Sequence, residues 1–108
     1  MSRGPDSGVL LERALRGAAE RGGVVLAIAD AGWTAWASAT FVGARHRLVL
    51  HAAAGDAFDR WLAELPEAEL PMRRHLVAEL AVTARWREDG AACAILEVLT
   101  VEADCAGG

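Results

Sequence analysis

The chain has 108 residues, of which 54% are hydrophobic and 24% are charged, and its formal net charge is -4. This length and composition indicate one folded globular domain, and they exclude an intrinsically disordered chain or a multidomain protein. The acidic balance disfavours binding to nucleic acid or to an anionic membrane surface, because both need a basic patch.

Every basic residue other than histidine is arginine, and the sequence contains no Lys, Asn, Gln or Tyr. Because the codons for arginine, alanine and glycine are rich in GC, we expect a bacterial gene from a GC-rich genome. No apolar run approaches the roughly 20 residues of a membrane span, and the first residues lack the apolar core of a secretion signal. We therefore expect a cytoplasmic protein in which Cys93 and Cys105 are reduced.

The first predicted element is an amphipathic helix. Residues 1–8 are expected to be a flexible lead, residues 9–102 a single domain, and residues 103–108 a flexible tail. Apolar side chains recur at helical spacing over 9–21, and Gly22-Gly23 supplies a stop.

Three strands are predicted next, over 24–30, 33–42 and 45–51. Ala31-Gly32 is a turn signal, and Gly43-Ala44 is a two-residue hairpin loop with glycine at its first position, as a type II′ turn requires. The short loops favour antiparallel neighbours.

The second half begins with a helix over 56–65, which carries a stripe of large apolar residues and is ended by Pro66. Two further strands, 75–86 and 91–102, are joined by a turn at "REDG". The predicted fold is therefore α+β, with two helices and a single five-stranded, mainly antiparallel sheet in the order α-β-β-β-α-β-β.

That order of elements is similar to the one in the bacterial type III secretion chaperones, which are small, acidic and dimeric. The similarity lies in order and size, and those proteins usually carry an additional helix at the C-terminus. It implies a dimeric binding protein and assigns no role to any residue.

Alternation along the strands sorts the side chains onto two faces. With Gly43-Ala44 as the loop, Trp36 is predicted to pair with His51, and Trp33 and His46 point to the core. The opposite face mixes apolar and polar side chains, as ligand or partner surfaces often do. The predicted binding or interface residues on or beside it are Trp36, Ser38, Thr40, Arg45, Arg47 and His51.

The strand over 91–102 is apolar on both faces, with Leu96 and Val98 opposite to Ile95 and Leu99. Such a strand is central in its sheet, covered on both sides, or part of an interface. Because two helices do not readily cover both faces of five strands, we expect self-association, as a dimer.

No metal site, cofactor or catalytic residue is predicted. His46 and His51 are an odd number of residues apart in one strand, so they point to opposite faces and cannot share a metal. Ser38 shares a predicted face with His51, but no nucleophile elbow or oxyanion loop accompanies the pair. An enzyme is therefore less favoured than a binding protein.

Three functions remain open. The leading hypothesis is a homodimer that serves as an adaptor or chaperone-like binding module through the mixed face around Trp36. The second is a minor enzyme or a protein for a small anionic ligand, with Arg47 as a fork of donors beside Trp36. A simpler interpretation of the arginines, which we favour, is that they keep a sheet edge soluble. The third is a component of phage or secretion assembly.

Overall fold

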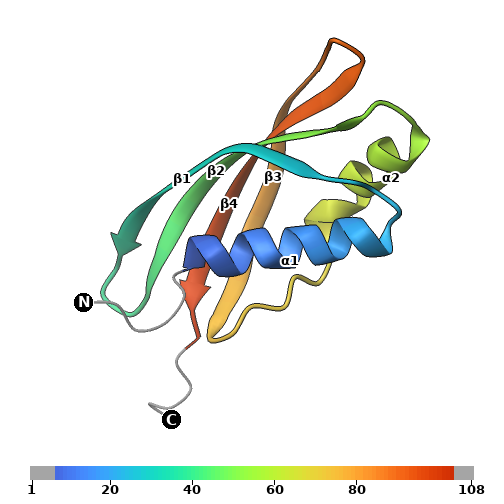
Figure 1. The fold of residues 1–108 in the computed structure, drawn as a ribbon. Coiled ribbons are helices and arrows are strands. Elements are labelled where there is room, and N and C mark those ends of the chain that lie inside the picture. The colour runs from blue at the N-terminus through green and yellow to red at the C-terminus, as the bar shows by residue number, and fades with distance from the viewer. Residues whose placement is uncertain (1–6, 104–108) are drawn as a thin grey trace.

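The structure, a computed structural model, describes residues 7–103 and contains two α-helices and one four-stranded antiparallel sheet (Figure 1). The sheet order is β1-β2-β4-β3, so the two sequential hairpins meet where β2 pairs with β4. The predicted α+β class is confirmed. The elements are α1 (Ser7–Arg21), β1 (Ala27–Ala37), β2 (Val42–Ala53), α2 (Asp56–Glu64), a 3-10 turn η1 (Leu65–Glu67), β3 (His75–Glu88) and β4 (Ala91–Glu102).

The predicted five-stranded sheet is wrong, because the strands expected over 24–30 and 33–42 are one strand, β1. Ala31-Gly32 does not turn: Ala31 pairs with Leu48 and Gly32 pairs with Arg47 in the β2 ladder. A bulge between Ile28 and Asp30 is the irregularity in this pairing. Glycine tolerates an extended backbone, so its presence marks a turn only where other turn-forming groups support it.

The first hairpin turns at Ser38 to Phe41, and not at Gly43-Ala44. The Ser38 amide donates to the Phe41 carbonyl at 2.7 Å, which closes the turn. The Ser38 hydroxyl oxygen accepts the amides of Thr40 and Phe41 at 3.3 and 3.1 Å. Side-chain bonds of this kind give the backbone a local alternative to the ladder, and here they decide where the chain reverses.

Two other chain reversals follow their sequence signals. At the end of α1, Gly23 has φ 77°, the Gly23 amide donates to Glu20, and the Val24 amide donates to Ala19. This pair of bonds is a Schellman motif. Between β3 and β4, Asp89 and Gly90 both have positive φ, as a tight two-residue hairpin turn requires.

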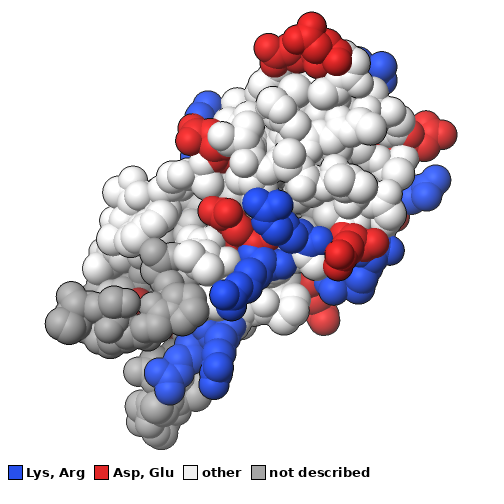
Figure 2. Space-filling view, viewed as in Figure 1, with Lys and Arg blue, Asp and Glu red and all other residues white. Residues whose placement is uncertain are grey.

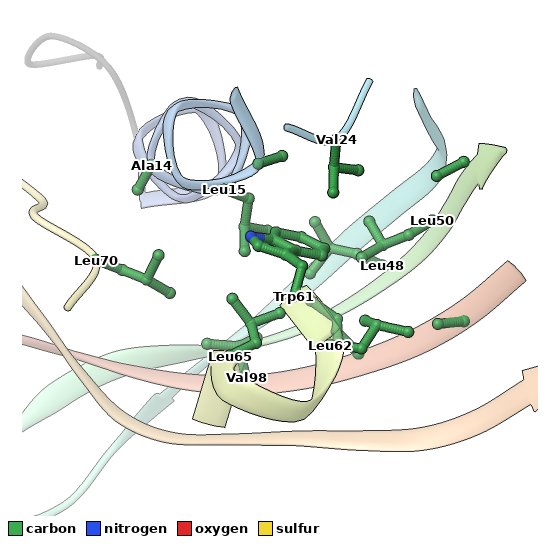
Figure 3. Close-up of a cluster of buried hydrophobic side chains, with 14 of the residues drawn as sticks. Ala14, Leu15, Val24, Leu48, Leu50, Trp61, Leu62, Leu65, Leu70 and Val98 are labelled. Atoms are coloured by element: carbon green, nitrogen blue, oxygen red, sulfur yellow. The ribbon is translucent and has the colours of Figure 1, made fainter. Parts of the chain in front are cut away.

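Both helices pack on the same face of the sheet, and the core lies between them and β2 and β4 (Figure 3). Trp61 of α2 lies between α1 and the sheet, and its ring stacks on Phe58 with a centroid separation of 6.0 Å. The predicted apolar stripe of this helix is therefore confirmed as core. The core includes Leu11 and Leu15 of α1, Phe58, Trp61 and Leu62 of α2, Leu65 of η1, Leu48 and Leu50 of β2, and Leu96 and Val98 of β4.

The apolar character of β4 on both faces reflects its central place between β2 and β3. β1 and β3 are the edge strands, and most residues of β1 are exposed. Within the described ranges, neither helix has the length and apolar character needed to cross a membrane. The expectations for residues 1–6 and 104–108, including Cys105, lie outside the described residues.

Candidate functional site

The sheet face opposite the helices, here called the open face, carries no helix of residues 7–103. Cross-strand pairing arranges its side chains in rows that run across the four strands. In the order β1, β2, β4, β3, the rows are Ala27, His51, Cys93, Trp86; Asp30, Val49, Ile95, Ala84; Gly32, Arg47, Glu97, Ala81; Thr34, Arg45, Leu99, Glu79; and Trp36, Gly43, Val101, Leu76.

The middle of the open face separates charges of opposite sign. Both arginines, Arg45 and Arg47, lie on β2, whereas Glu97 lies on β4 and Glu79 on β3. All four side chains are exposed. Within residues 7–103 neither arginine is in a salt bridge, since the ion pair of the described chain joins Arg85 to Asp59 on the helix side. A hollow of about 580 Å³ lies over these charges.

Each end of the open face carries an exposed apolar side chain. Leu76 is 61% exposed at one end, and Trp86 is 37% exposed at the other. Half-buried aliphatic side chains, Val49 and Ile95, lie side by side between Trp86 and the charges. The face therefore combines a charged centre with an exposed apolar side chain at each end, and a further acidic residue, Asp30, lies in the row of Val49 and Ile95. No secondary element of the described chain covers it.

Trp36 packs on a glycine. It pairs with Gly43 across the first hairpin, and a Cβ added at Gly43 would lie 2.9 Å from the Trp36 Nε1 and would collide with the carbonyl oxygen of Thr100. The indole nitrogen is buried and has no hydrogen-bond partner among the described residues. An aromatic ring over a strand glycine covers backbone that would otherwise be exposed.

The structure separates the six predicted site residues into two groups. Trp36, Arg45, Arg47 and His51 all lie on the open face. The predicted pairing of Trp36 with His51 is wrong, because Trp36 pairs with Gly43 and His51 pairs with Ala27 at the other end of the sheet. Ser38 and Thr40 lie in the β1–β2 turn, so the expected approach of Ser38 to His51 does not occur.

Leu76 and Trp86 were not among the predicted site residues, since strict alternation along β3 places both on the core side with Leu80 and Val82. Two bulges, between Val77 and Glu79 and between Val82 and Ala84, move them to the open face. The residues at these bulges, Ala78 and Thr83, are ordinary strand residues, so the sequence contains no signal for the change.

Other reactive side chains are engaged or isolated. His46 is buried on the helix side, with its Nε2 2.9 Å from the Thr100 Oγ1. Burial, with a smaller effect from Glu88, raises the pKa of the Cys93 thiol, so the thiol stays protonated and is a weak nucleophile. No cluster of three or more His, Cys, Asp or Glu that could hold a metal ion occurs in the described part of the chain.

A larger hollow of about 1240 Å³ lies on the helix side, between the end of α1, η1 and the segment that leads into β3. Its wall carries charges of both signs, among them Arg21, Arg73, Glu64 and Glu69. Trp61 also lines this hollow, and its buried Nε1 has no hydrogen-bond partner among the described residues. These features do not select a ligand.

The chain matches no protein-family model, no curated protein and no solved structure.

Proposed function

We propose that this protein works by association, as a homodimer that serves as an adaptor or chaperone-like binding module of the bacterial cytoplasm, and that its open face is the surface that contacts another polypeptide chain. The observation that carries the proposal is that both helices pack on one side of the sheet. Exposed Leu76 and Trp86 then remain on the other side, on either side of a charged centre. Polypeptide interfaces combine apolar anchors, aromatic residues and arginine in this way.

A site for a small anionic ligand has less support. The hollow on the open face contains Arg45 and Arg47, but Glu79 and Glu97 line it too, so its formal charges cancel. An anion would gain from the arginines and be repelled by the glutamates at similar distances. Opposite charges side by side suit a macromolecular surface that carries the complementary arrangement.

An enzyme has less support still. The hypothesis needs Ser38 and His51 in one pocket, and neither residue lines the hollow on the open face. The Ser38 hydroxyl is engaged with the backbone of its own turn. A role in phage or secretion assembly has no separate observation to support it.

The proposal is tested by measuring molar mass by light scattering on the purified full chain across the micromolar range. Two exposed tryptophans give a matched pair of variants: Trp86 lies on the open face, and Trp33, 49% exposed, lies on the helix side of β1. We expect an assembled wild type, at least tenfold weaker association for Trp86→Arg, and no change for Trp33→Arg. Trp36→Ala is expected to act like Trp86→Arg.

A wild type that stays monomeric throughout this range would overturn the proposal. So would dissociation caused by Trp33→Arg alone, because that result places the contact on the other side of the sheet.

A further inference from the structure

We infer that the partner of the open face is a second copy of this chain, bound about a two-fold axis that runs parallel to the strands between β2 and β4. The inference rests on the proposed function and adds the partner and the arrangement. Two copies of one sheet can meet face to face about an axis along the strands or about an axis across them. The charges on the open face distinguish these two arrangements.

A two-fold axis parallel to the strands lays each row over the same row of the partner, with the order of the strands reversed. β2 then faces the partner's β4, so Arg47 lies over the partner's Glu97, and Glu97 lies over the partner's Arg47. Because Arg47 and Glu97 are also neighbours within one sheet, the four charges alternate in sign in both directions. Each charge then has opposite charges as its nearest neighbours, which favours the pair.

An axis across the strands gives the opposite result. It lays β2 over the partner's β2, so Arg47 meets the partner's Arg47 and Glu97 meets the partner's Glu97. Like charges brought together at an interface oppose association. The separation of arginines on β2 from glutamates on β4 and β3 therefore favours one orientation of the second copy.

Three of the remaining rows also fit under the parallel axis, whereas in the fourth Arg45 lies over the partner's Leu99. Val49 lies over the partner's Ile95, and Trp36 lies over the partner's Leu76, so apolar side chains meet apolar ones. Trp86 lies over the partner's Ala27, where a small side chain leaves room for an indole. This reciprocal match is what an isologous interface requires, since both copies present the same surface.

The area is of the right order for a dimer. Four strands about 4.8 Å apart and five rows about 6.7 Å apart cover roughly 600 Å² of planar surface on each copy. Stable interfaces bury about 800 Å² of accessible surface per partner, and accessible surface exceeds planar area. The hollow of about 580 Å³ at the centre leaves space for long arginine side chains between the two sheets.

The decisive experiment mixes two single variants. In Arg47→Glu both members of the central pair are acidic, and in Glu97→Arg both are basic. We expect each variant alone to associate at least tenfold more weakly than the wild type, because like charges then face each other across the axis. An equimolar mixture should form a heterodimer with an association constant within about threefold of the wild-type value, measured by light scattering with native mass spectrometry.

Each copy in the mixture still has two like charges side by side within its own sheet. Recovered association in the mixture therefore reports the charges that face each other across the axis, and not repulsion within one copy. The controls are Arg87→Glu, on the helix side of β3, and Glu20→Arg, on α1, which change net charge by the same amounts away from the open face. Both should dimerise normally.

The outcomes separate this inference from the proposed function. If Trp86→Arg dissociates the dimer but the charge variants associate like the wild type, the two-fold arrangement is overturned and the open face remains the contact. If association survives all open-face variants but is lost in Ala35→Lys, which charges the exposed edge strand β1, the copies join by strand addition and both proposals fail.

Discussion

His46 lies on the helix side of β2 with 4% of its surface exposed, and its imidazole is held by Thr100 of the neighbouring strand. The Thr100 hydroxyl also lies 3.4 Å from the Ala44 carbonyl and donates to it. The Thr100 hydroxyl of β4 therefore bridges the His46 ring and the Ala44 carbonyl, which both belong to β2. The odd spacing of His46 and His51 correctly predicted that they occupy opposite faces, and the burial of His46 follows from that parity.

Replacing Thr100 by valine should destabilise the fold. Thr100→Val keeps the volume and the β-branched shape but removes both hydrogen bonds of a fully buried hydroxyl. We expect the free energy of unfolding to fall by about 1–3 kcal/mol, the usual cost of losing buried hydrogen-bond partners. Urea unfolding measures the change.

The control is Thr40→Val, at an exposed position of the β1–β2 turn, which should change the free energy of unfolding by less than about 0.5 kcal/mol. Equal losses for Thr100→Val and Thr40→Val would contradict the role of Thr100.

At the scale of elements, the two glycines of the first hairpin differ in the space around them. Gly32 of β1 has room for a side chain, whereas Gly43 of β2 does not. A Cβ at Gly32 would meet nothing within 4 Å, whereas a Cβ at Gly43 of β2 would collide with Thr100 and crowd the Trp36 indole. Gly43 is therefore needed where two backbones and a ring approach closely. The sequence suggests a turn at both glycines, and the structure places both inside strands.

Gly43→Ala should destabilise the protein by about 1–3 kcal/mol, as expected for overpacking, and should disturb Trp36. Gly32→Ala should have little effect on unfolding or raise the midpoint slightly. Thermal unfolding followed by tryptophan fluorescence measures both effects. A larger loss for Gly32→Ala than for Gly43→Ala would show that the close approach to Thr100 is not what constrains this part of the sheet.

The faces of the first hairpin were predictable, although its turn was not. The predicted partner of Trp36 was His51 and the observed one is Gly43, a shift of eight positions. Because eight is an even number, Trp36, Arg45, Arg47 and His51 keep a common face under either register. The location of the turn depends on hydrogen bonds between the Ser38 side chain and nearby backbone amides, and such local bonds leave no periodic pattern in the sequence.

The faces of β3 were only partly predictable for a related reason. Each bulge inserts one residue and exchanges the two faces beyond it, so Leu80 and Val82 point to the core while Leu76 and Trp86 do not. Alternation predicts faces well within an unbroken ladder. It fails at an irregularity whose residues, Ala78 and Thr83, carry no distinctive chemistry.

The two sides of the whole molecule differ in chemistry. Figure 2 shows charged side chains of both signs gathered over α1 and acidic ones at the tip of the β3–β4 hairpin, on the side that carries the helices. The open face carries two arginines and two glutamates at its centre, an exposed apolar side chain toward each end and Asp30 between. The proposed contact uses this side of the sheet and leaves the charged surface of the helices in solvent.

Hydrogen exchange should follow the order of strands in the sheet. β2 and β4 are central and carry most of the buried strand residues, so their amides should exchange most slowly. Residues 31–37 of β1 have one neighbouring strand and little cover, so they should exchange fastest among the strand segments. Mass spectrometry of peptic fragments measures this order. Slow exchange over residues 31–37 would instead indicate a further strand added to that edge.

The place of β4 has a consequence for the synthesis of this protein on the ribosome. β4 is the latest of the four strands to leave the ribosome, yet it lies between β2 and β3 and pairs with both. The two hairpins join through the pairing of β2 with β4, for example of Gly43 with Val101. The four-stranded sheet therefore cannot form before β4 has been synthesised. Until β4 has been made, the apolar stripes of both helices have no complete sheet to pack against. We therefore expect the chain to reach its native packing only after β4 has left the ribosome.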